Sequence, residues 1–237
     1  MRKLLVVFLF LRLTSWSQDV DLSASANNYR FDSQIWAKAK ATLPLNKKTE
    51  ISAQYISRIY LDGTTNPGSY FYLSGKRSLK KWLAADFTTR FVIDQGYNMY
   101  RLEAGLKVKK NVKDFQFAFR TAGFLENRTI AFTNVLSRST YYFWRNRVEA
   151  SWSPKKKWEF GASFETWNVF NYRYNGKLDK ACVTVDAEYK LTKHHALTLA
   201  YQNQFDIQKA HKTSLNMYVL GYEYTFKRLN EKKKNQH

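Results

Sequence analysis

The chain lacks the features that mark several common protein classes. It contains one cysteine, Cys182, so no disulfide can form within it. It has three prolines, Pro44, Pro67 and Pro154, and each falls where we expect a turn. Apart from the apolar run at 4–11, no stretch approaches the roughly 20 apolar residues that a membrane-spanning helix needs. These absences exclude an internally disulfide-bonded domain and a helical membrane protein.

The N-terminus has the layout of an export signal. Residues 1–3 are basic after the initiator methionine, residues 4–11 (LLVVFLFL) are apolar, and Ser15, Trp16 and Ser17 form a small–x–small cleavage site. The alternative is a buried N-terminal strand. The expected organisation is therefore a signal peptide at 1–17, one outer-membrane β-barrel at 18–226 and a basic periplasmic tail at 227–237.

Residues 218–226 show the period-two pattern of a β-strand. One face carries Tyr218, Leu220, Tyr222, Tyr224 and Phe226, which alternate with smaller or polar residues. A soluble sheet rarely exposes such a face to water, and the pattern recurs along the chain, so lipid is the expected solvent. The spacing of Gly221, Tyr224 and Phe226 also resembles the C-terminal signal read by the outer-membrane barrel assembly machinery.

About eleven such strands can be placed from residue 34 onward, and short connections alternate with longer, turn-rich ones. The longer connections are expected at 62–68, 126–138 and 168–179. Bacterial single-chain barrels have an even number of strands and both termini in the periplasm, so we add a strand at 20–26. The predicted fold is all-β: a single transmembrane antiparallel up-and-down β-barrel of about 12 strands in the bacterial outer membrane. A secreted soluble sandwich is the alternative.

Strand parity separates apolar from charged side chains. One set contains no charge, and it includes Ile51, Tyr55, Phe71, Leu73, Phe87, Phe91, Phe117, Phe119, Trp144, Val148, Phe164, Leu199 and Leu220. Because a charge that faces lipid at mid-membrane costs about 2–4 kcal/mol, the charged face must be the lumen. Within it we predict a charge network, either a selectivity ring or a plug, formed by Arg101, Glu103, Arg145, Arg147, Glu149, Glu165, Asp186 and Glu188.

The net charge of +20 raises the question of nucleic-acid binding. The predicted lumen is nearly neutral, however, and the excess lies in the short turns and the tail, at Lys47–Lys48, Lys80–Lys81, Lys109–Lys113, Lys155–Lys157 and 227–234. Basic residues at one membrane surface attract anionic lipid headgroups, although they also serve simply to solvate turns. We therefore expect outer-membrane lipids, and no nucleic acid, as partners.

Several motifs fall at matching places on these strands. They are Arg145-Asn146-Arg147 after a long loop, Ser163-Phe164-Glu165 on the next strand, Leu178-Asp179 at the start of the following one, and the final hairpin at 199–202 and 217–226. In this pattern the chain resembles a family of bacterial outer-membrane barrels catalogued as domain of unknown function 2490. The strand before Arg145 departs from it, with Arg120 alone where such barrels carry a dense arginine and glutamate run. The resemblance implies location and fold, since the family has no assigned activity.

No motif predicts a catalytic residue, a metal site or a cofactor. His211 and Ser214 form the only histidine–hydroxyl pair that could meet at the outer rim, and residues three apart in a strand face opposite sides. The first hypothesis is a small pore or binding protein for a small polar solute. One alternative is a closed structural or partner-docking barrel with a salt-bridged lumen, which docks through 126–138 and 168–179. A membrane lipid-modifying enzyme is the third.

Overall fold

The computed structural model describes residues 29–61, 68–94, 97–132, 135–170, 176–207 and 212–228. Its regular elements are eleven strands: β1 (Tyr29–Pro44), β2 (Thr49–Tyr60), β3 (Ser69–Ser78), β4 (Leu83–Asp94), β5 (Tyr97–Val112), β6 (Phe115–Phe132), β7 (Val135–Lys155), β8 (Trp158–Val169), β9 (Lys177–Lys190), β10 (His195–Asp206) and β11 (Lys212–Thr225). Within these ranges, no helix has the length and apolar character needed to cross a membrane.

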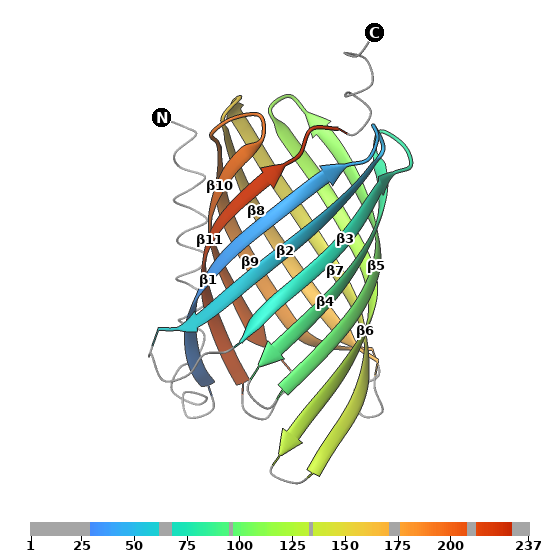
Figure 1. Ribbon diagram of the computed structural model, residues 1–237, viewed down its shortest axis with the longest axis vertical. Coiled ribbons are helices and arrows are strands. Elements are labelled where there is room, and N and C mark those ends of the chain that lie inside the picture. The colour runs from blue at the N-terminus through green and yellow to red at the C-terminus, as the bar shows by residue number, and fades with distance from the viewer. Residues whose placement is uncertain are drawn as a thin grey trace.

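The strands form one closed barrel in chain order (Figure 1). Every pair of consecutive strands is antiparallel, as short connections between neighbours require. The closing pair joins β1 to β11, with partners that run from Tyr29↔Lys212 to Thr42↔Thr225. The predicted all-β, up-and-down barrel is confirmed.

The described part of the chain contributes eleven strands, where about twelve were expected. Because the number is odd, the first and last strands run in the same direction and pair in parallel. Tyr29 and Thr225 therefore lie at opposite ends of the barrel. The extra strand expected at 20–26 and the export signal at 1–17 fall outside the described residues. A common periplasmic side for both termini stays a prediction.

Two of the three long connections were predicted too long. The segment at 126–138 is mostly strand, because β6 and β7 stay paired as far as Phe132↔Val135. Their hairpin projects beyond the neighbouring strands (Figure 1). The segment at 168–179 also shortens, since β8 ends at Val169 and β9 begins at Lys177. The prediction took polarity as a sign of a loop, whereas lumen-facing strand residues of a barrel are polar too.

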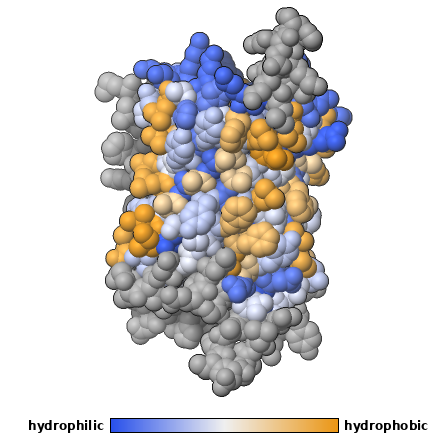
Figure 2. Space-filling model, viewed as in Figure 1, coloured by the Kyte–Doolittle hydropathy of each residue, from blue (hydrophilic) through white to orange (hydrophobic). Residues whose placement is uncertain are grey.

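The outer face of the barrel is apolar. Large side chains exposed there include Ile51, Tyr55, Phe71, Leu73, Phe87, Phe91, Phe117, Phe119, Trp144, Val148, Phe164, Leu199 and Leu220. Figure 2 shows hydrophobic residues over the strands and hydrophilic residues gathered at the upper end, where the short turns lie. Monomeric soluble proteins rarely expose an apolar surface of this extent, and the pattern is typical of a lipid-facing band.

Candidate functional site

The lumen contains a cavity of about 720 Å³, lined by residues from all eleven strands. Along β6 the lining runs from Gln116, near the short turns, to Arg128, near the opposite end. At about 3.3 Å per residue this stretch is roughly 40 Å of strand, which a tilt of about 40° reduces to about 30 Å of height. The apolar band of such barrels is about 25 Å tall. The cavity therefore extends through the full height of the band.

The structure places all eight predicted network residues on the wall of this cavity: Arg101, Glu103, Arg145, Arg147, Glu149, Glu165, Asp186 and Glu188. They come from β5, β7, β8 and β9. Strand alternation brings each of them to the inner face, because the residues between them point outward. Five of the eight meet in one set of ion pairs on the wall from β4 to β8: Glu103, Arg145, Arg147, Glu149 and Glu165. Arg101 belongs to a second set around Glu126, and Asp186 and Glu188 lie on β9 apart from both.

Glu103 is at the centre of the first group. Its Oε1 accepts a hydrogen bond from Arg120 Nη2 at 2.5 Å and another from Arg145 Nη2. Arg120 also donates from Nε to Asp86 Oδ2 at 3.0 Å, so its guanidinium is shared by two carboxylates. Glu103 is 5% exposed and Arg120 6% exposed. Buried charges of this kind persist only when each has a partner, and here each has at least two.

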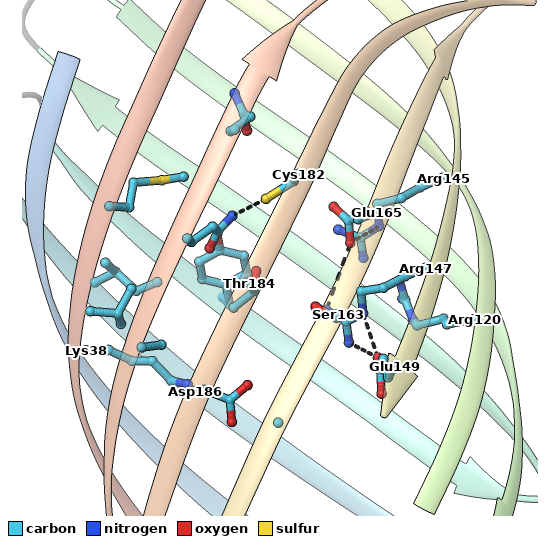
Figure 3. A pocket seen from close by; sticks show the side chains of 18 of the residues that line it. Lys38, Arg120, Arg145, Arg147, Glu149, Ser163, Glu165, Cys182, Thr184 and Asp186 are labelled. Atoms are coloured by element: carbon cyan, nitrogen blue, oxygen red, sulfur yellow. Dashed lines mark hydrogen bonds and ion pairs between the residues drawn. The ribbon is translucent and has the colours of Figure 1, made fainter. Parts of the chain in front are cut away.

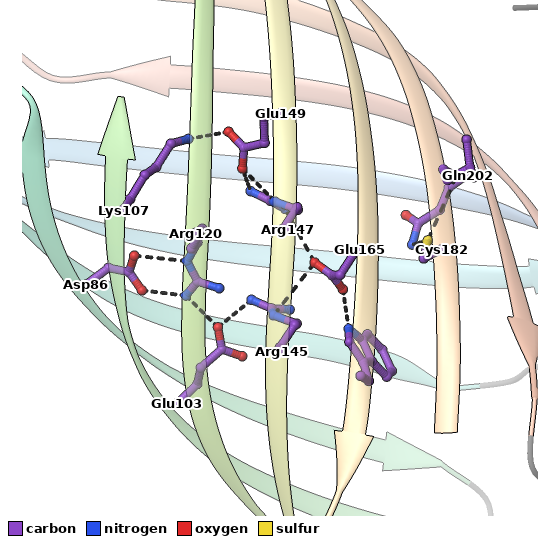
Figure 4. Close-up of polar contacts among 12 residues, drawn as sticks. Asp86, Glu103, Lys107, Arg120, Arg145, Arg147, Glu149, Glu165, Cys182 and Gln202 are labelled. Carbon is purple, nitrogen blue, oxygen red and sulfur yellow. Dashed lines mark hydrogen bonds and ion pairs between the residues drawn. The ribbon is translucent and has the colours of Figure 1, made fainter. Parts of the chain in front are cut away.

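Glu165 and Glu149 continue the group onto β7 and β8. Glu165 Oε2 lies 3.7 Å from Arg145 Nε and 3.9 Å from Arg147 Nη1. Arg147 Nε donates to Glu149 Oε1 at 2.5 Å, and Lys107 contacts the other oxygen of the same carboxylate. Figure 4 shows the resulting chain of contacts crossing neighbouring strands. The arginines therefore bridge strands that are already paired through the backbone.

Glu126 is the most buried carboxylate of the lumen, with no exposed surface. Its Oε2 accepts from Arg101 Nε at 2.8 Å and lies 3.4 Å from Arg90 Nη2, and its Oε1 accepts from Arg128 Nε at 2.6 Å. The Arg101 guanidinium also lies over the ring of Phe124, 4.1 Å from its centre. Our prediction placed Glu126 and Arg128 in a connection and missed both. Their shared parity with the lumen residues of β6 was the signal that could have found them.

Two glycines make room for the charged side chains. A Cβ atom on Gly105 would lie 3.0 Å from Asp86 Oδ1, and a Cβ atom on Gly161 would lie 2.5 Å from Asp186 Oδ1. Each glycine is the cross-strand partner of the acid that it accommodates. Each carboxylate therefore lies over the backbone of the neighbouring strand, in space that a side chain at the glycine position would occupy.

The opposite wall, from β9 through β11 to β2, mixes neutral and charged groups. Its neutral lining includes Ile56, Cys182, Thr184, Ala200, Gln202, Gln204, Met217 and Val219, and its charged lining is Lys38, Lys40, Lys180, Asp186, Glu188 and Glu223. Gln202 Nε2 donates to Cys182 Sγ at 3.0 Å (Figure 4). Lys38 and Asp186 reach into the cavity between these groups (Figure 3), and neither forms an ion pair with another described residue. The cavity thus has one wall of densely paired charges and one wall on which amide, hydroxyl and apolar groups lie among fewer charged residues.

The charged wall carries an excess of positive charge. From β4 to β8 its cations are Arg90, Arg101, Lys107, Arg120, Arg128, Arg145 and Arg147, and its anions are Asp86, Glu103, Glu126, Glu149, Glu159 and Glu165. Seven cations face six anions. The side chains of Arg147 and Arg128 are the most open of the arginines, at 35% and 28% exposure. Arg147 is paired with Glu149 and Arg128 with Glu126, and the exposed part of each guanidinium can still contact a solute in the cavity.

The histidine–hydroxyl pair gains no support as a catalytic site. His211 lies outside the described residues. Ser214 shares the parity of the outward-facing Tyr218 and Leu220, and its Oγ accepts a hydrogen bond from Asn203 Nδ2 at 3.0 Å. Among the residues with described positions, no group of three or more His, Cys, Asp or Glu side chains could hold a metal ion.

Comparison with known proteins yields solved barrels at low similarity. The KdgM porin has a TM-score of 0.49 at 12% identity, over 79% of this chain and 90% of its own. The β domain of the Bordetella autotransporter BrkA has a TM-score of 0.45 at 10% identity, over 75% and 82%. A porin refined at 1.8 Å resolution has a TM-score of 0.35 at 9% identity, over 74% and 58%. Similarity at this level carries no functional argument.

No model of a known protein family matches the chain, and no curated protein matches it. The resemblance to domain of unknown function 2490 therefore stays a prediction. Of its motifs, Arg145, Arg147 and Glu165 share one cluster of ion pairs, while Leu178 and Asp179 lie at the start of β9.

Proposed function

We propose that this protein is an outer-membrane β-barrel whose lumen is a small pore for a small polar solute. The apolar outer face supports a location in lipid. The main support for a pore is the cavity, which extends through the height of the apolar band. Its volume of about 720 Å³ lies within the range of about 300–1,000 Å³ of cavities that hold a small molecule.

The two walls suggest what such a solute is like. Arginine and lysine side chains line pores that select anions, and here Arg128 and Arg147 are the most exposed arginines of the charged wall. The facing wall offers amide and hydroxyl groups from Gln202, Gln204 and Thr184. Hydrogen-bonding groups of this type replace part of the hydration shell of a polar molecule. A small anionic or hydroxyl-rich solute fits both walls.

A closed structural or partner-docking barrel is the second candidate, and the ion-pair network favours it. Glu126 and Glu103 engage at least two arginines each, which leaves little of either carboxylate for a solute. Phe124 and Phe143 stack inside the lumen with ring centres 4.7 Å apart and narrow it at the level of Arg101. In this case the projecting β6–β7 hairpin would offer the docking element.

Conductance of the refolded protein in a planar bilayer separates the two candidates. Because Cys182 is the sole cysteine and lines the cavity, small methanethiosulfonate reagents of either charge provide a second readout. A pore shows steady openings that fall when Cys182 is modified, with the anionic reagent faster. The Cys182→Ser variant should conduct, and neither reagent should change its conductance. A barrel that inserts, stays silent and keeps its thiol unmodified would overturn the pore in favour of the closed barrel.

A further inference from the structure

Lysine residues gather at one end of the barrel. The five connections β1–β2, β3–β4, β5–β6, β7–β8 and β9–β10 all open at the end where β11 finishes (Figure 1). Exposed lysines lie in or next to each of them and directly after β11: Lys47, Lys48, Lys80, Lys81, Lys110, Lys113, Lys155, Lys156, Lys157, Lys193 and Lys227. We call these eleven residues the lysine rim.

The charge of the lysine rim is not neutralised within the described part of the protein. None of its members forms an ion pair with another described residue. Asp114 is the sole acidic residue in the five connections themselves. The lumen charges, in contrast, are mostly paired with one another. The rim is therefore a separate, strongly cationic surface that the proposed pore does not use.

An aromatic belt lies next to the rim on the outer face of the barrel. It consists of Trp82, Phe115, Trp152, Trp158, Phe160, Tyr189, Tyr222, Tyr224 and Phe226. Neighbouring members contact across strands: ring centres are 6.1 Å apart for Phe115 and Trp152 and 4.7 Å apart for Trp158 and Tyr189. Tryptophan and tyrosine concentrate where a bilayer meets water, and barrels carry such girdles at both interfaces. The belt therefore marks the level of the lipid headgroups.

The lysine side chains lie close to this belt. Lys80 Nζ is 5.4 Å from the centre of the Trp82 ring, and Lys157 Nζ is 5.9 Å from the centre of the Tyr189 ring. Because these rings belong to the outer, lipid-facing surface, the ammonium groups lie outside the barrel wall and away from the cavity. An anionic headgroup at the level of the belt would thus meet several ammonium groups within a Debye length, about 8 Å at physiological salt.

We propose that the lysine rim binds the phosphate headgroups of anionic phospholipids and enriches these lipids around one end of the barrel. Ammonium groups are compact point charges suited to phosphate, and each adds about fivefold to the affinity for an anionic membrane surface when it lies near it. A nucleic acid or an acidic protein would need a cationic face turned toward water, whereas this one adjoins a lipid-facing belt. The inference rests on the membrane location in the proposed function, and it does not require a pore.

The tryptophans of the belt provide the assay. The barrel is reconstituted in phosphatidylcholine vesicles that contain the same fraction of either brominated phosphatidylglycerol or brominated phosphatidylcholine, whose acyl chains quench nearby tryptophan. We expect phosphatidylglycerol to be enriched about three- to fivefold over phosphatidylcholine around the protein, and 0.5 M NaCl to reduce the preference. In the K155Q/K156Q/K157Q variant, beside Trp152 and Trp158, the preference should fall at least twofold. The matched K155R/K156R/K157R variant should keep it.

Four results would overturn the inference, and they have different meanings. Equal quenching by the two brominated lipids would show that the rim does not select anionic headgroups. A preference that survives both high salt and the glutamine substitutions would place the selective surface elsewhere. Loss of the preference in inorganic phosphate, but not in NaCl of equal ionic strength, would indicate a site for free phosphate instead of lipid. Absence of quenching by either lipid would refute the membrane location itself, and with it the proposed function.

Discussion

Replacing Glu126 by glutamine should destabilise the barrel more than any other single loss of a lumen carboxylate. The glutamine keeps the shape of the side chain but removes the charge that balances Arg101 and Arg128, whose Nε atoms lie 2.8 and 2.6 Å from the carboxylate oxygens. Its amide NH₂ group would also face guanidinium donors. Removal of one partner from a buried ion pair costs about 3–5 kcal/mol, and Glu126 has no exposed surface. We expect a loss in that range.

Glu159→Gln is the matched control. Its carboxylate pairs with Lys190 at 3.3 Å, but the two side chains are 36% and 44% exposed. Ion pairs with this exposure contribute about 0.2–1 kcal/mol, so the control should lose no more than that. Urea unfolding in detergent micelles, followed by tryptophan fluorescence, gives both values, provided that the m-values agree. If both variants lost the same free energy of unfolding, below about 1 kcal/mol, Glu126 would be no more buried than an exposed surface residue. That result would refute the buried cluster.

Three further outcomes are expected. Replacing Arg145 and Arg147 together by alanine should shift the reversal potential toward cations while heat-modifiable gel migration persists; unchanged selectivity with lost heat resistance would instead favour a structural lattice. Gly161→Ala should cost about 1–3 kcal/mol in the same unfolding assay, because its Cβ would lie 2.5 Å from a carboxylate oxygen, whereas Gly75→Ala, with nothing within 4 Å, should be nearly neutral. Phe226→Ala should lower the yield of barrel assembled in cells but not the yield refolded in detergent, if the assembly machinery reads this strand; equal losses would argue against that role.

The strand alternation predicted much of the inner surface because side-chain direction in a strand is a local property. Arg145, Arg147 and Glu149 share parity, so they had to face the same side whatever the rest of the chain did. Their charge then assigned that side to the lumen, since lipid would penalise it. All three line the cavity in the structure. The same parity was present at Glu126, but its polar surroundings were interpreted as a loop.

What the sequence by itself determined is the fold class, the two faces of the barrel wall and the position of the basic turns, because each depends on neighbours along the chain. Only the tertiary structure decided the partners. Glu126 on β6 meets Arg101 on β5 and Arg90 on β4, and such contacts depend on the register between strands. The parallel closure of β1 on β11 was likewise decided in three dimensions. Register and closure arise from hydrogen bonds between segments far apart in the chain, and no local pattern specifies them.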